Sequence, residues 1–179
     1  MHIAVVQAMK SQQGAFVVSS KMVWKEKSNQ HEFQVLLNNS LGEPLILGGQ
    51  VNHFYPHKGS VWVRNKKDNK AQVVRLCLRG KHRNKRPDDR TVWEGASHLH
   101  RWSVTDRDQF ATNPDNPPWP PLSWVEGSFE PLTKGSFRAA FESFCAMHGI
   151  LCDFTEHWTD VPEPVGPGYV VTPRGEEVP

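Results

Sequence analysis

Closely spaced histidines and arginines fall in one stretch of the sequence, from Arg75 to Trp102. His98 and His100 are separated only by Leu99, so on a β-strand both imidazoles project from one face, with their Cα atoms about 6.5 Å apart. Imidazoles titrate near neutral pH, and guanidinium groups bind phosphate. These residue types at this spacing are suited to chemistry on a phosphodiester.

The first hypothesis is metal-independent cleavage of RNA by a toxin-type endoribonuclease. One imidazole would remove the proton of a 2′-hydroxyl, and a second would protonate the leaving oxygen. The candidate catalytic residues are His82, His98 and His100. The expected phosphate-binding residues are Arg75, Arg79, Lys81, Arg83 and Arg101, and Trp102 is the expected base-stacking residue. This hypothesis requires neither a metal nor a cofactor.

Two other hypotheses use the same residues. His98 and His100 with a third histidine can form a facial set for zinc, iron or manganese, although no acidic residue lies at an obvious spacing and neighbouring cations oppose a divalent ion. Alternatively, the cluster is not catalytic. It would then be a docking surface for nucleic acid or for a protein partner, as in an antitoxin or defence inhibitor, or a polar network within the fold.

Charge is distributed unevenly along the chain. The formal net charge is +2, yet the segment from Lys58 to Arg90 holds twelve Lys or Arg and three Asp, a local balance of +9. A basic block on an otherwise acidic chain is typical of a polyanion-binding face. The composition therefore favours nucleic acid as the partner, with RNA first, while a protein partner stays open.

Alternating apolar residues predict an α+β fold with a curved antiparallel sheet of five to seven strands packed on one C-terminal helix. The strand signals lie at residues 22–24, 32–39, 44–51, 60–64, 72–79 and 97–102, with a further short strand at 150–154. Along 72–79 the alternation places Arg75, Cys77 and Arg79 on the face opposite Leu76. If this strand pairs with residues 97–102, three histidines and several arginines share one surface.

The helix is expected over residues 136–148. Phe137, Phe141 and Phe144 recur at helical spacing, and Gly149 is suited to end the helix. The predicted organisation is an N-terminal arm or short helix in residues 1–20, a single domain over 21–159, and a Pro/Gly-rich tail over 160–179.

Several classes of protein are disfavoured. The three cysteines are an odd number without CxxC spacing, which argues against a disulfide framework and a zinc finger. No apolar run reaches the roughly 18 residues of a membrane helix, and the first residues lack the pattern of a signal peptide. We therefore expect a cytoplasmic protein with no membrane partner.

Three short motifs carry a resemblance to a known family. They are Arg75-Leu76, then Gly80-Lys81-His82-Arg83-Asn84, then His98-Leu99-His100. The order R-L, G-x-H-x-N, H-L-H resembles an uncharacterised family of small bacterial proteins encoded near mobile elements. The match covers about thirty residues and implies no defined activity. The genomic setting of that family suggests, by association, a role in toxin–antitoxin or phage-defence systems.

Overall fold

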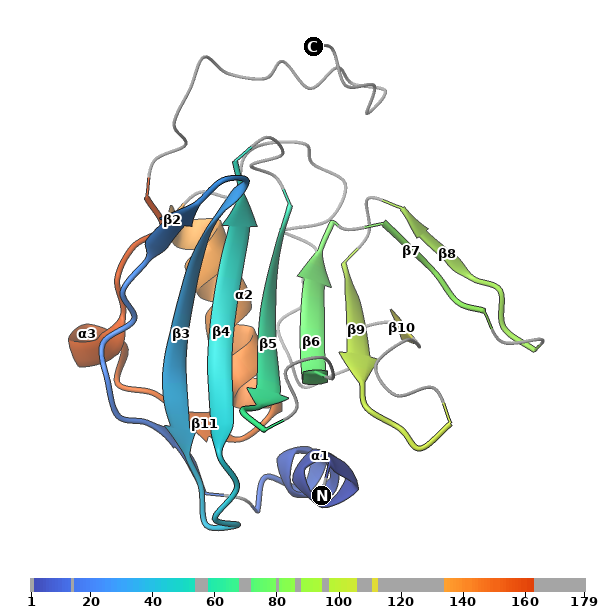
Figure 1. The fold of residues 1–179 in the computed structure, drawn as a ribbon, viewed down its shortest axis with the longest axis horizontal. Helices are drawn as coiled ribbons and strands as arrows, with labels where there is room; N and C mark the ends of the chain where they lie inside the picture. Colours follow the sequence, from blue (N-terminus) through green and yellow to red (C-terminus); the bar gives the residue numbers. More distant parts are fainter. Residues whose placement is uncertain are drawn as a thin grey trace.

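The computed structural model describes residues 2–13, 15–53, 58–67, 72–79, 81–85, 88–94, 97–105, 111–112 and 134–162. In these residues a nine-stranded sheet curves past one long helix, α2 (Lys134–Met147) (Figure 1). The strand order is β10-β9-β6-β5-β4-β3-β1-β11, with β2 also paired to β3. A second sheet contains two strands, β7 and β8.

The centre of the large sheet is an antiparallel meander of four consecutive strands. These are β3 (Gln30–Asn38), β4 (Leu45–Asn52), β5 (Gly59–Asn65) and β6 (Gln72–Leu78). The shorter strands are β1 (Phe16–Val18), β2 (Lys25–Lys27), β9 (His98–Arg101), β10 (Ala111–Thr112) and β11 (Ile150–Leu151). The small sheet is the hairpin of β7 (Lys81–Arg83) and β8 (Val92–Glu94).

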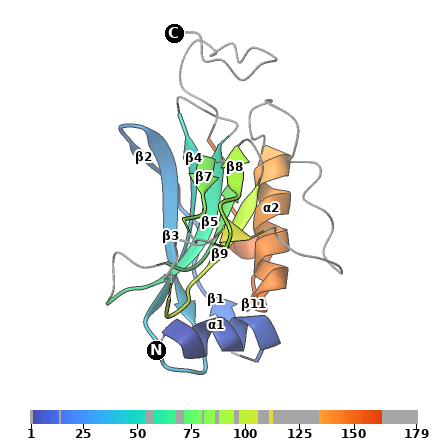
Figure 2. The same ribbon diagram turned by 90° about the vertical axis from the view of Figure 1, so that its right-hand side faces the viewer.

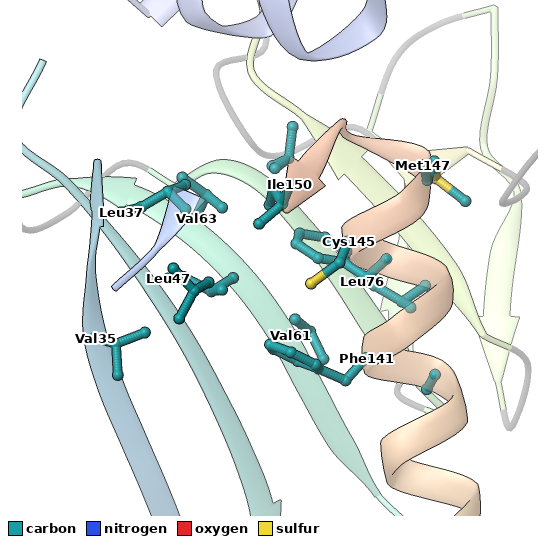
Figure 3. Close-up of a cluster of buried hydrophobic side chains, with 14 of the residues drawn as sticks. Val35, Leu37, Leu47, Val61, Val63, Leu76, Phe141, Cys145, Met147 and Ile150 are labelled. Carbon is teal, nitrogen blue, oxygen red and sulfur yellow. The ribbon is translucent and has the colours of Figure 1, made fainter. Parts of the chain in front are cut away.

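The hydrophobic core lies between the sheet and α2. Alternate residues of the meander, such as Val35, Leu47 and Leu76, face the helix and are buried (Figure 3). From α2, Phe141 and Phe144 are fully buried as well, so the predicted phenylalanine stripe does face the sheet. One face of the sheet is therefore fixed by the core, and polar side chains can collect only on the other.

The first twenty residues take part in this core. They contain α1 (His2–Ser11), which lies across one end of the sheet (Figure 2), and then β1. Val5 and Met9 of α1 are buried. β1 pairs with β3 in antiparallel fashion and with β11 in parallel, so it lies inside the sheet, next to the edge strand β11.

The α+β class with a curved sheet is confirmed, but the counts of elements are corrected. In the described residues the sheet has nine strands where five to seven were expected, and α1 and α3 (Phe154–His157) accompany α2. The additional strands have two or three residues, too few for alternation to show. The expected strand at 150–154 ends at Leu151, because the Asp153 carboxylate accepts hydrogen bonds from the backbone N–H of Thr155 and Glu156 and begins α3.

Two other expectations also shift. The strand expected at 22–24 begins instead at Lys25, while Met22 is buried in the core and Trp24 packs against it. The helix expected over 136–148 spans Lys134–Met147. Of the predicted tail, only residues 160–162 are described, and Val161 is buried; residues 163–179 lie outside the described part. No helix in the described part of the chain is long and apolar enough to cross a membrane.

Candidate functional site

The candidate site is built on the pairing of β6 with β9. In this antiparallel pair Cys77 lies opposite His98, and Arg75 lies opposite His100. Between them, Leu76 and Leu99 form a pair that faces the core and is fully buried. The four polar side chains therefore share the face of the sheet that turns away from α2.

The third predicted histidine comes from the hairpin β7–β8. The ring centroid of His82 is 4.7 Å from that of His100 and 5.7 Å from that of His98, and the His98 and His100 centroids are 5.0 Å apart. We call these three residues the histidine cluster. The structure thus brings together residues from two sheets that no local sequence pattern connects.

Two local features direct the hairpin toward β9. Arg79, at the end of β6, has φ +49°, a left-handed conformation that turns the chain sharply out of the strand. At the end of β7, the buried amide of Asn84 donates to the carbonyl oxygen of Ala111 and accepts from its backbone N–H, both at 2.8 Å. Because Ala111 in β10 pairs with His100, Asn84 fixes the hairpin against the strand that carries the cluster.

Arg75 contacts the cluster directly. Its Nη2 lies 3.2 Å from the Nε2 of His100. A guanidinium group has no acceptor, so Arg75 donates and His100 Nε2 carries no proton in this contact. This arrangement places one phosphate-binding candidate, Arg75, in direct contact with a histidine of the cluster.

Cys77 lies beside the histidine cluster and is not among the predicted site residues. Its sulfur and one nitrogen each of His98 and His100 all lie within 4.8 Å of one another. The alternation along residues 72–79 already placed Cys77 on the face of Arg75. What the sequence could not supply is the register that sets this thiol opposite His98.

Access to the three imidazoles differs. His98 is 1% exposed and His100 is 0% exposed, whereas His82 is half-buried. Two of the three rings are therefore shielded from solvent. A mechanism in which two imidazoles both meet a dissolved substrate needs this part of the molecule to open.

The other predicted contact residues divide into three groups. Lys81 and Arg83 alternate with His82 along β7 and are exposed. Arg79 is buried, at 4% exposure. Arg101 and Trp102 lie away from the cluster, because Arg101 pairs with core-facing Val74 and Trp102 packs against the core.

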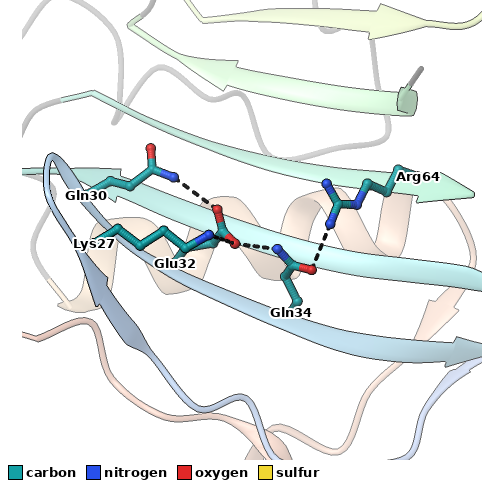
Figure 4. Close-up of polar contacts among 5 residues, drawn as sticks. All are labelled: Lys27, Gln30, Glu32, Gln34 and Arg64. Atoms are coloured by element: carbon teal, nitrogen blue, oxygen red, sulfur yellow. Dashed lines mark hydrogen bonds and ion pairs between the residues drawn. The ribbon is translucent and has the colours of Figure 1, made fainter. Parts of the chain in front are cut away.

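The polar face of the sheet continues from the cluster toward β3. Arg64 lies over the ring of Trp62, 4.7 Å from its centroid, and donates to Gln34 at 2.8 Å. Gln34 in turn donates to Glu32, which also accepts hydrogen bonds from Gln30 at 3.0 Å and Lys27 at 2.9 Å (Figure 4). These contacts hold the open face together independently of the core.

Glu32 is largely buried within this network. Burial would raise the pKa of its carboxyl, but hydrogen bonds from Lys27 and Gln34 and the charge of Arg64 outweigh it and lower the pKa. Glu32 is therefore a carboxylate held in its charged form. Its hydrogen bonds are with residues of β2 and β3 and not with the histidine cluster.

Two described histidines outside the cluster, His148 and His31, are buried within the fold. His148, at the end of α2, is fully buried, and its Nδ1 is 2.9 Å from the carbonyl oxygen of Phe144. Burial lowers the pKa of His148 to about 3. His31 packs on His53 with ring centroids 4.2 Å apart, and burial together with His53 lowers the pKa of His31.

Comparison of the chain with protein-family models, with curated proteins and with solved structures gives no match. The resemblance of the three short motifs to a mobile-element-associated family therefore stays a prediction. The conclusions about function depend on the site itself.

Proposed function

We propose that this protein binds nucleic acid, with RNA as the first candidate, through the hairpin β7–β8 beside the histidine cluster. The observation that carries the proposal is the alternation along β7. His82 packs on the rings of His98 and His100, while Lys81 and Arg83 on either side of it are exposed. A strand that is anchored on one face and basic on the other is suited to contact with phosphates.

Further charges extend this basic face. Lys85 follows β7 and Arg90 precedes β8, and both side chains are exposed. With Lys81 and Arg83 they give four exposed cations among the described residues of this hairpin. Such a group binds a polyanion mainly by releasing its condensed counterions, so affinity depends steeply on salt.

Burial favours binding over catalysis. A general acid or base must come within hydrogen-bond distance of the proton that it transfers. His98 and His100 are 1% and 0% exposed, so a bound nucleic acid meets His82 first. The two inner imidazoles support the binding surface from beneath.

The test measures binding of a fluorescent single-stranded RNA across a salt series. The variant Lys81→Ala/Arg83→Ala/Lys85→Ala removes three cations from the hairpin, and its control, Lys10→Ala/Lys21→Ala/Lys25→Ala, removes three exposed cations elsewhere. For the hairpin variant we expect the slope of log affinity against log salt to fall by about 2, since each lost phosphate contact to a single strand contributes about 0.7. An affinity that does not respond to salt, or equal losses in both variants, overturns the proposal.

Metal-independent cleavage of RNA is a second candidate, favoured by the Arg75–His100 contact at 3.2 Å within the histidine cluster. The 2′-oxygen would attack phosphorus as His82 takes its proton, and the bond to the 5′-oxygen would break as a second, protonated imidazole gives that oxygen a proton. The products would be a 2′,3′-cyclic phosphate and a 5′-hydroxyl. Cleavage by the chelator-treated protein, lost in His82→Ala, would support this candidate, and intact RNA would exclude it.

A further inference from the structure

We propose that Cys77, His98 and His100, with His82 as the fourth ligand, form a zinc site that fastens the hairpin β7–β8 to the large sheet. This inference shares residues with the proposed binding surface but does not depend on its affinity for RNA. A ligand of a structural metal ion does not need solvent access, so the inference gives the buried His98 and His100 a role.

The donor set fits zinc chemically. Structural zinc sites are tetrahedral and closed, and they combine cysteine sulfur with histidine nitrogen. Cys77, His98 and His100 offer one thiol and two imidazoles within 4.8 Å of one another. The ring centroid of His82, the fourth candidate, lies 4.7 Å from that of His100. The buried pair His98 and His100 would keep water from the ion, as expected for a structural rather than a catalytic site.

The spacing of the rings supports the same conclusion. With Zn–N bonds of about 2.0–2.1 Å, two imidazoles at a tetrahedral angle have centroids roughly 5 Å apart. The three centroid distances in the histidine cluster are 4.7, 5.0 and 5.7 Å. Each ring therefore already lies at about the separation that a shared ion requires.

The donor atoms lie somewhat farther apart than they would around a bound zinc ion. Ligand atoms around tetrahedral zinc lie roughly 3.3–3.7 Å apart. Those of Cys77, His98 and His100 lie within 4.8 Å of one another. The β6–β9 ladder fixes the backbones of these residues, so zinc binding requires the side chains to move together by about 1 Å.

Arg75 is the group that opposes the ion. It donates to Nε2 of His100, so zinc must either use Nδ1 of that ring or displace the guanidinium. Arg75 is half-buried, and the second arrangement requires its side chain to move away from His100. The zinc ion then takes the place of the guanidinium group, and the Cys77 thiolate formed on binding offsets part of the added positive charge.

The zinc site and metal-free cleavage are mutually exclusive uses of the same nitrogens. An imidazole nitrogen bound to zinc cannot accept or deliver a proton. Metal content therefore separates the two, and RNA affinity is measured apart from both. A zinc protein that fails to bind RNA would retain this inference and lose the proposed function, and an RNA-binding protein without zinc would do the reverse.

The experiment uses the full chain without a histidine tag. Metal content is measured after dialysis from excess Zn²⁺, and Co²⁺ is then substituted as a spectroscopic probe. We expect about one equivalent of zinc. The Co²⁺ form should show the intense visible bands of tetrahedral geometry and a thiolate charge-transfer band.

Cys77→Ser should abolish the charge-transfer band and weaken zinc binding by at least about 100-fold. The matched control is Cys152→Ser, which removes a half-buried thiol outside the cluster and should leave both readouts unchanged. Should Cys77→Ser fail to fold, alkylation of Cys77 in the natural sequence replaces it, and Zn²⁺ should protect that thiol. A chain without stoichiometric zinc, a spectrum insensitive to Cys77→Ser, or a Cys77 thiol alkylated equally with and without Zn²⁺ overturns the inference.

Discussion

Arg75 and His100 face each other across β6 and β9, and the guanidinium Nη2 lies 3.2 Å from the imidazole Nε2. This contact places a permanent positive charge against the innermost histidine of the cluster. Any ligand of the cluster, whether a metal ion or a phosphate, must respond to that charge. The positive charge repels a metal ion and attracts a phosphate. A substitution of Arg75 should therefore change the affinities for the two ligands in opposite directions.

Arg75→Gln should have opposite effects on zinc and on RNA. Removing the guanidinium frees His100 Nε2 and removes repulsion of the ion, so zinc affinity should rise about tenfold. Removing a candidate phosphate contact should lower RNA affinity and reduce the salt slope by about 0.7. Chelator competition and RNA titration measure the two effects, and unchanged zinc affinity would show that Arg75 does not compete for the site.

Asn84→Ala should loosen the hairpin β7–β8. It leaves the buried N–H and carbonyl groups of Ala111 without the amide that they contact at 2.8 Å, at a cost of about 1–3 kcal/mol in unfolding free energy. Zinc affinity should fall about tenfold, because His82 would no longer be held against the cluster. Hydrogen exchange of residues 81–85 and zinc titration measure these effects.

The control for this change is Asn39→Ala. The Asn39 amide also bridges backbone groups, donating to Leu37 and Glu43 in the turn between β3 and β4. That variant should lose stability without any change in zinc affinity. Equal zinc affinity in Asn84→Ala and the natural sequence would contradict the positioning role of Asn84.

Phe141→Ala tests the core that supports the site. The Phe141 ring is fully buried, with its centroid 5.6 Å from that of Phe33 and 5.2 Å from that of Trp158. Its removal should lower the free energy of unfolding by about 3–5 kcal/mol in urea denaturation. Leu36→Ala, at a side chain that is 55% exposed, should change it by no more than about 0.5 kcal/mol. A stable Phe141→Ala variant would contradict the packing of α2.

The stability of the metal-free protein should fall as the pH is lowered from about 6.5 to about 3. Burial lowers the pKa of His148 from its ordinary value of 6.5 to about 3. In this range the unfolded chain binds a proton at His148 that the folded chain does not, so acid favours unfolding. The contribution approaches about 1.4 kcal/mol per pH unit well inside the range.

His148→Leu removes this proton uptake and should flatten the dependence measured by urea unfolding between pH 7 and pH 5. Part of the slope should remain, because burial and His53 also lower the pKa of His31. An unchanged slope in His148→Leu would show that His148 does not carry the acid sensitivity.

The central fold could be predicted because its signals are local. Alternation along β3 to β6 and the phenylalanine spacing of α2 each depend on residues a few positions apart. The common face of His98 and His100, with Leu99 turned to the core, followed from the same period of two. Short strands such as β1 and β10 could not be predicted, since they form only where another strand is already in place.

Only some residues of the site could be predicted from the sequence. Asn84 is part of one motif and Cys77 directly follows another, but their roles depend on a register and on a contact with β10 that no sequence spacing encodes. Arg101 and Trp102 were assigned to the site by proximity along the chain. The strand alternation from His100 places Arg101 on the opposite face, a signal that was present in the sequence.

The parallel pairing of β1 with β11 has a consequence for biosynthesis. Phe16 has Ile150 as its partner, and the Trp24 indole donates to the carbonyl oxygen of Thr159 across 135 positions. A ribosome can release β3 to β6 as a meander long before these partners emerge. The nascent chain therefore carries an open strand edge and an uncovered Phe16 until residues 150–159 have been synthesised, an interval in which chaperone binding would matter most.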